Sequence, residues 1–148
     1  MAISPNDDFT AGAVLTAEQQ NRFPRGVMAF NTNTTTNAGV TGEATQITAT
    51  AFTAVANRYY KITYFEPDCV GGTGYFTFRI KNGGTTLQTF YQLSGAGVDR
   101  HANGVYIGTF SAGSVTITAT AQQSAGTGIL GRGSNTIAFL SIEDIGPA

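Results

Sequence analysis

Alternation of apolar and polar residues with a period of two constrains the fold of this chain more than any other feature. It is clearest over residues 75–81, where Phe76, Phe78 and Ile80 alternate with polar or tyrosine side chains. Successive side chains of a strand point to opposite faces, so this segment is typical of a sheet with one buried face. The glycines at 83 and 84 and a second β-like run over 85–93 follow, which predicts a hairpin with a glycine turn.

The same short pattern recurs along the chain between Gly, Asn or Ser residues. Further strands are predicted over residues 26–30, 44–50, 52–55, 58–66, 104–110, 114–122 and 136–145. No helical periodicity separates them. Short strands at this spacing indicate an all-β fold, an antiparallel β-sandwich of about eight strands with jelly-roll or Greek-key connections.

The N-terminal residues lack this alternation and instead show the pattern of a short helix. Thr16 and Gln19 have the spacing of a helix capping box, and Pro24 ends any helix that starts there. A helix this short is unstable alone in water, so it must pack against another surface. We therefore divide the chain into an N-terminal docking segment (1–30) and a β-sandwich domain (31–148). The candidate docking residues are the apolar side chains Leu15, Phe23, Val27 and Phe30.

Composition excludes several classes of partner. Eight basic and nine acidic residues give a net charge of -1, so no basic patch is available for nucleic acid or an anionic membrane. A single cysteine, Cys69, excludes an internal disulfide and a cysteine-rich zinc site. Only 11% of the residues are charged, while 23 are Thr and 19 are Gly, and a surface with so few charges tends to associate. We expect neighbouring subunits to cover much of it.

Catalytic patterns are scarce. The one histidine, His101, shares a glycine-rich loop with Ser94 and Asp99, but such a loop lacks the rigid frame that a catalytic triad needs. The string over 126–131 matches a dinucleotide fingerprint, yet another strand follows it instead of a helix. Glu143 and Asp144 are adjacent in a strand and so face opposite sides. The sequence predicts no enzyme and no catalytic, cofactor or metal site.

Two loops, 66–74 and 94–103, are rich in glycine and in polar side chains. Such side chains can hydrogen-bond the hydroxyl groups of a host-surface glycan, and outward tyrosines can add ring contacts. The alternative for the outward aromatic residues is a subunit interface, which we favour for a chain with so few charges. The candidate recognition residues of these loops are Asp68, Asp99, Arg100, His101 and Asn103.

Three blocks of sequence resemble small virion proteins of tailed bacteriophages, described as capsid-decoration, head-fibre or minor tail proteins. Residues 15–27 contain Leu-Thr-Ala and Phe-Pro-Arg-Gly-Val, residues 52–63 read Phe-Thr-Ala-Val-Ala-Asn-Arg-Tyr-Tyr-Lys-Ile-Thr, and residues 140–147 read Leu-Ser-Ile-Glu-Asp-Ile-Gly-Pro. They occur in matching order and cover about a third of the chain. None of the blocks is a catalytic motif.

The resemblance implies a β-sandwich, often trimeric, that the N-terminal segment holds on the outside of a virion. The expected function is therefore a non-enzymatic virion structural protein, a homotrimer that decorates or stabilises the capsid or tail surface. Its expected partners are further copies of itself and the major capsid protein or a tail protein. The alternative is a module of a tail or head fibre that binds a carbohydrate receptor on the host.

Overall fold

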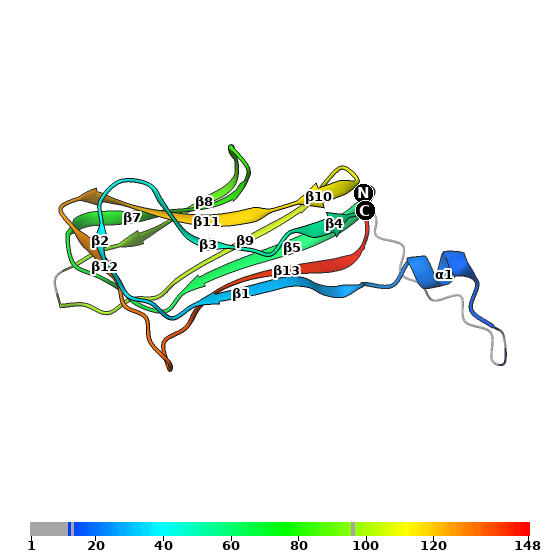
Figure 1. Cartoon of the computed structure of the whole chain (residues 1–148), viewed down its shortest axis with the longest axis horizontal. Helices are drawn as coiled ribbons and strands as arrows, with labels where there is room; N and C mark the ends of the chain where they lie inside the picture. Colours follow the sequence, from blue (N-terminus) through cyan, green and yellow to red (C-terminus); the bar gives the residue numbers. More distant parts are fainter. Residues whose placement is uncertain (1–11, 13, 96) are drawn as a thin grey trace.

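Two four-stranded antiparallel sheets pack face to face in the computed structural model, which describes residues 12, 14–95 and 97–148 (Figure 1). In the first, here called the β1 sheet, the strand order is β1 (Gly26–Asn33), β13 (Ala138–Pro147), β5 (Arg58–Glu66) and β9 (Ala102–Thr109). In the second, the β3 sheet, the order is β3 (Ala44–Thr48), β11 (Ile117–Ala125), β7 (Thr73–Asn82) and β8 (Thr85–Leu93).

The order of these strands along the chain defines a jelly roll. The chain alternates between the sheets through β1, β3, β5 and β7, forms the β7–β8 hairpin, and then alternates back through β9, β11 and β13. Two interleaved Greek keys of this kind make the eight-stranded jelly roll. The predicted all-β antiparallel sandwich is confirmed.

Short strands complete both ends of the sandwich. At one end, β4 (Phe52–Ala54) pairs with β10 (Gly113–Val115). At the other end, β12 (Gly128–Leu130) pairs with both β2 (Asn37–Val40) and β6 (Cys69–Val70). These strands do not belong to the two main sheets, and they place backbone hydrogen bonds where the connecting segments turn from one sheet to the other.

The core lies between the two main sheets and follows the predicted alternation. Every second residue of β5 points into the core, and Tyr60, Ile62 and Tyr64 in the middle of the strand are fully buried. Phe76, Phe78 and Ile80 are buried from the opposite sheet. In the β7–β8 hairpin, Phe78 pairs with Phe90 across the strands and their rings stack with centroids 5.3 Å apart. The turn uses Gly83 at φ 56°, as the sequence predicts.

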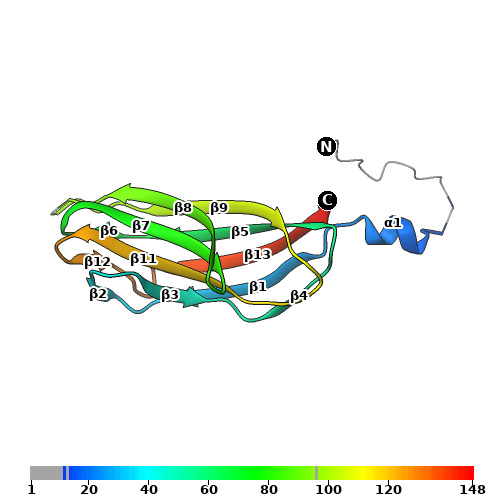
Figure 2. The same cartoon turned by 90° about the horizontal axis from the view of Figure 1, so that it is seen from above.

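A short helix, α1 (Ala17–Asn21), precedes the sandwich. The predicted capping box is present: the Gln19 amide donates to Thr16 Oγ1 over 3.2 Å, and the Thr16 amide donates to Gln19 Oε1 over 2.9 Å. The helix ends before Pro24, and β1 begins at Gly26. Figures 1 and 2 show α1 beyond the end of the sandwich at which β5 begins and β13 ends. The boundary expected at residue 30 falls inside β1, so the structure places residues 26–30 within the jelly roll.

Candidate interaction surfaces

A buried arginine fastens the N-terminal segment to the sandwich. Arg58, the first inward residue of β5, donates from Nε and Nη2 to the two carboxylate oxygens of Asp144 on β13, over 2.5 and 2.7 Å. The same guanidinium donates from Nη1 to the carbonyl oxygen of Asn21 and from Nη2 to that of Phe23, over 2.5 and 2.6 Å. The main chain between α1 and β1 is therefore tied to the core.

Electrostatics keep this pair ionised. Burial alone would raise the pKa of Asp144, but hydrogen bonds from the Arg58 guanidinium and the Gly146 amide outweigh burial and lower it. The hydrogen bond to Asp144 in turn raises the pKa of Arg58. Because a bidentate guanidinium–carboxylate contact is directional, the pair also fixes the angle at which the N-terminal segment leaves the sandwich.

The four candidate docking residues occupy two places. Leu15 is half-buried before α1, and Phe23 is exposed after it. Val27 and Phe30 are exposed on β1. In a regular strand, the side chains of residues 27 and 30 would point to opposite faces. The pairing of β1 with β13 shifts register between Val27 and Ala29, as at a β-bulge, so both Val27 and Phe30 lie on the outer face.

Aromatic rings form a row across the outer face of the β1 sheet. Phe30 stacks on Phe139 with centroids 5.8 Å apart, and Phe139 stacks on Phe65 at 5.4 Å. The imidazole of His101 lies 6.2 Å from Phe65 at the end of the row. Large apolar side chains on an outward sheet face mark an interaction surface more often than single exposed residues do.

The two recognition loops come together at the end of the sandwich opposite α1. The Cys69 amide donates to the Arg100 carbonyl over 2.6 Å, and Asp68 and Asp99 are close enough to interact electrostatically. Burial first, then the charges of Asp99 and Glu66, raises the pKa of Asp68. Asp68, Asp99 and Arg100 thus share one loop cluster, and their role in recognition stays a prediction.

The other two recognition candidates lie beside the aromatic row. His101 is exposed with its ring against Phe65, and Asn103 pairs with Phe65 on the outer face of β9. Cys69, behind the loops, is buried, and burial raises the pKa of its thiol well above the usual range. A buried thiol with a raised pKa is an inert structural cysteine.

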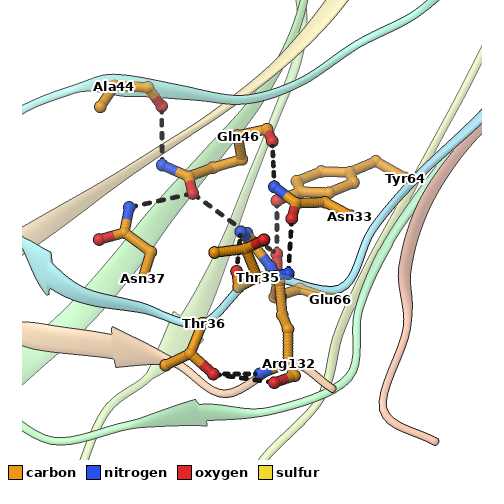
Figure 3. A network of polar contacts seen from close by, with 9 residues as sticks. All are labelled: Asn33, Thr35, Thr36, Asn37, Ala44, Gln46, Tyr64, Glu66 and Arg132. Atoms are coloured by element: carbon orange, nitrogen blue, oxygen red, sulfur yellow. Dashed lines mark hydrogen bonds and ion pairs between the residues drawn. The ribbon is translucent and has the colours of Figure 1, made fainter. Parts of the chain in front are cut away.

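A second buried ion pair, which sequence reasoning missed, braces this loop end (Figure 3). Arg132 donates from Nε and Nη2 to the two carboxylate oxygens of Glu66, over 2.8 and 2.7 Å. The Tyr64 hydroxyl donates to Glu66 over 2.8 Å, and Arg132 also donates to the Gln46 side chain and to the Thr35 carbonyl. The network joins β5, β3, the segment after β1 and the segment after β12.

A shallow depression of about 360 Å³ lies on the outer face of the β7–β8 hairpin near the same loops. It is lined by Tyr75, Tyr91 and Leu93, all exposed. The two tyrosine rings meet edge to face with centroids 5.4 Å apart. Its position is close to both loops, because the Ser94 amide donates to the Gly74 carbonyl over 3.0 Å.

Within the part of the chain that the structure describes, no three His, Cys, Asp or Glu side chains are grouped closely enough to hold a metal ion. Its helix is too short to cross a membrane. The fold and these surfaces define a class of protein, a jelly-roll module. Its N-terminal segment is attached at one end of the sandwich, its polar loops lie at the other end, and an aromatic row lies on one face.

No family model matches the chain, and no curated protein matches its sequence. Among solved structures, a protein of Bacillus endospore appendages, described as a novel family of disulfide-linked pili, is 14% identical with a TM-score of 0.46, over 82% of this chain and 90% of that chain.

Two further solved structures match the chain with lower TM-scores. A family 35 carbohydrate-binding module from Clostridium thermocellum is 17% identical with a TM-score of 0.36, over 80% of this chain and 96% of that chain. A protein in the structure of infectious bursal disease virus Gx strain is 15% identical with a TM-score of 0.38; the match covers 84% of this chain but 42% of the viral one. Likeness at this level carries no argument about function, which depends on the surfaces themselves.

Proposed function

We propose that the chain is a non-enzymatic structural protein of a bacteriophage virion, a homotrimer that decorates or stabilises the outer surface of the capsid or tail. The N-terminal segment binds the major capsid protein or a tail protein, and the loop end faces outward. The observation that carries the proposal is the attachment of α1 beyond one end of the jelly roll, with Arg58 holding its base (Figure 2).

The N-terminal segment before β1 has the properties of a docking element. Ala17, Gln20 and Asn21 of α1 are exposed, so these side chains do not pack into the jelly-roll core. A helix of five residues is too short to be stable through its own hydrogen bonds. Packing of the helix and of Leu15 and Phe23 against another protein would supply the missing stabilisation. The resemblance of residues 15–27 to virion proteins supports the same assignment.

Deletion of residues 1–20 tests the docking role. This truncation retains the Asn21 and Phe23 carbonyls, so Arg58 keeps both of its main-chain acceptors. We expect the truncated chain to melt at the temperature of the full chain but to bind virions depleted of the protein roughly tenfold or more weakly. Val98→Ala, an exposed site in the opposite loops, is the matched control and should bind normally. Full occupancy by the truncated chain would contradict the proposal.

A second candidate function is recognition of a host-surface carbohydrate at the loop end. The exposed tyrosine pair of the depression favours it, because aromatic rings contact the apolar faces of sugars while their hydroxyls give direction. A glycan array with the full chain, compared with Tyr91→Ala, tests this function. Signal that Tyr91→Ala abolishes would support it, and no signal at high protein concentration would remove it.

A further inference from the structure

The outer face of the β1 sheet carries its most exposed large apolar residues on the two edge strands, while Phe65 and Phe139 on the central strands are half-buried. On β1, Val27 and Phe30 are 63% and 57% exposed, and on β9, Val105 and Ile107 are 43% and 55% exposed. We call these two pairs the β1 patch and the β9 patch. Each patch is a strip of apolar surface in contact with solvent in the single chain.

The strand register places the two patches at the same height along the sheet. One row runs from Phe30 through Ser141 and Thr63 to Val105. The next row runs from Val27 through Glu143 and Lys61 to Ile107. Every apolar residue of one patch therefore has an apolar counterpart at its own level in the other patch.

The two patches cannot meet within one chain. Three strand spacings separate β1 from β9 in the sheet, roughly 14 Å at the usual separation of neighbouring strands. Polar side chains occupy the intervening strands at these rows: Ser141 and Thr63 in one, Glu143 and Lys61 in the other. Among the described residues both patches stay open to solvent, so a second molecule can pack on each.

Charge on this face suits a second copy of the same chain. Lys61 and Glu143 are the charged residues among the outward positions of these four described strands, and they pair with each other over 3.7 Å. The face is thus neutral, and copies that approach through it bring no unpaired like charges together. An unrelated charged partner would meet only this mutually paired lysine and glutamate, with no net charge of opposite sign to attract it.

We propose that the β1 patch of one copy packs on the β9 patch of the next copy, around an axis roughly parallel to the strands. This inference rests on the homotrimer of the proposed function and names its contact surface. Because the patches lie at the same level, each copy is related to the next by rotation with no shift along the axis. A contact between two different patches closes into a ring when rotation alone, by a whole fraction of a full turn, relates neighbouring copies, whereas a shift along the axis builds a filament.

The mass of the purified full chain in solution, by native mass spectrometry and light scattering, tests the contact. We expect three times the 15.4 kDa chain. Phe30→Glu and Val105→Arg should each convert the assembly to monomers, because each buries an unpaired charge against an apolar patch. The double variant should regain the oligomer, since every contact then holds one glutamate opposite one arginine. Thr118→Glu on the outer face of the β3 sheet is the control and should change nothing.

Each result has one meaning. Rescue by the double variant supports the pairing of the patches. A double variant that stays monomeric, with a circular dichroism spectrum like that of the full chain, would overturn it, because Phe30 would then contact something other than Val105. A trimer that neither single variant disturbs would overturn the contact but leave the proposed trimer intact. A dimer that shows the same loss and rescue would support the contact and contradict the trimer.

Discussion

Both ends of the jelly roll are closed by a buried pair of an arginine and a carboxylate, and β5 contributes one member to each. Arg58 begins this strand and pairs with Asp144, whereas Glu66 ends it and pairs with Arg132. The remaining donors of the two arginines differ. Those of Arg58 reach main-chain carbonyls in the N-terminal segment, and those of Arg132 reach Gln46 and Thr35 inside the sandwich.

The same chemistry therefore has two consequences. At the loop end, the ion pair joins parts of the jelly roll to each other, so its loss acts on the fold. At the other end, it joins the jelly roll to a segment that has little core of its own, so its loss acts on the attachment of that segment as well. Substitutions at the two ends should separate these effects.

The largest effect is expected for Arg132→Met. The fully buried carboxyl group of Glu66 would lose its arginine partner, and breaking a buried pair in this way costs about 3–5 kcal/mol of unfolding free energy. Denaturant unfolding measures the loss. Adding Glu66→Gln removes the carboxyl group that lost its partner, while the new amide oxygen can still accept from the Tyr64 hydroxyl, and should recover most of the stability. A loss as large in the double variant would contradict this explanation.

Arg58→Met should destabilise by about 2–3 kcal/mol, because Asp144 loses its two charge-assisted hydrogen bonds. Unlike Arg132→Met, it also releases the carbonyls of Asn21 and Phe23. We therefore expect trypsin to cleave faster after Arg22 and Arg25 in the folded protein. Arg132→Met is the comparison variant, and equal cleavage rates at matched stability would show that Arg58 does not hold the segment.

Asp144→Asn should cost about 1–2 kcal/mol at neutral pH, since the amide cannot accept the bidentate contact as a carboxylate does. The folded-state pKa of Asp144 is lowered, so its contribution is present above the unfolded value near 3.9 and is lost as pH falls through the folded pKa. Melting curves of both proteins from pH 7 down to acid should converge. A constant gap would refute the ionic origin.

The smallest effect has the opposite sign. The folded-state pKa of Asp68 is raised, so ionisation of this carboxyl opposes folding, and the penalty grows as pH rises above the unfolded value. Asp68 Oδ1 is also buried without a hydrogen-bond partner among the described residues. Asp68→Asn should stabilise by up to about 1 kcal/mol at pH 7 and by less near pH 3. Thermal melts at the two pH values check this, and destabilisation at pH 7 would contradict it.

Local sequence patterns predicted those parts of the fold that depend on interactions between residues close together in the chain. Alternation over residues 75–81 gave the strand and its buried face, and Thr16 with Gln19 gave the helix cap. The short strands β2, β6 and β12 were missed, because segments of two to four residues have no detectable period. Their pairing depends on contacts between distant parts of the chain.

The ion pairs leave a partial signal in the sequence. Arg58 and Glu66 have the same parity as Tyr60, Ile62 and Tyr64, so alternation alone places both charges inward. Their partners, Asp144 and Arg132, are about 66 to 86 residues away and follow only from the tertiary fold. Alternation likewise gave no warning of the register shift that puts Val27 and Phe30 on one face.

The presence of the chain in purified virions tests the proposed virion assignment most directly. Quantitative mass spectrometry of particles purified through a density gradient and washed in salt would give its ratio to the major capsid protein. The account predicts that the chain stays with the particles, with a high ratio indicating the capsid shell and a low one the tail. Its absence from infectious particles would contradict the virion assignment.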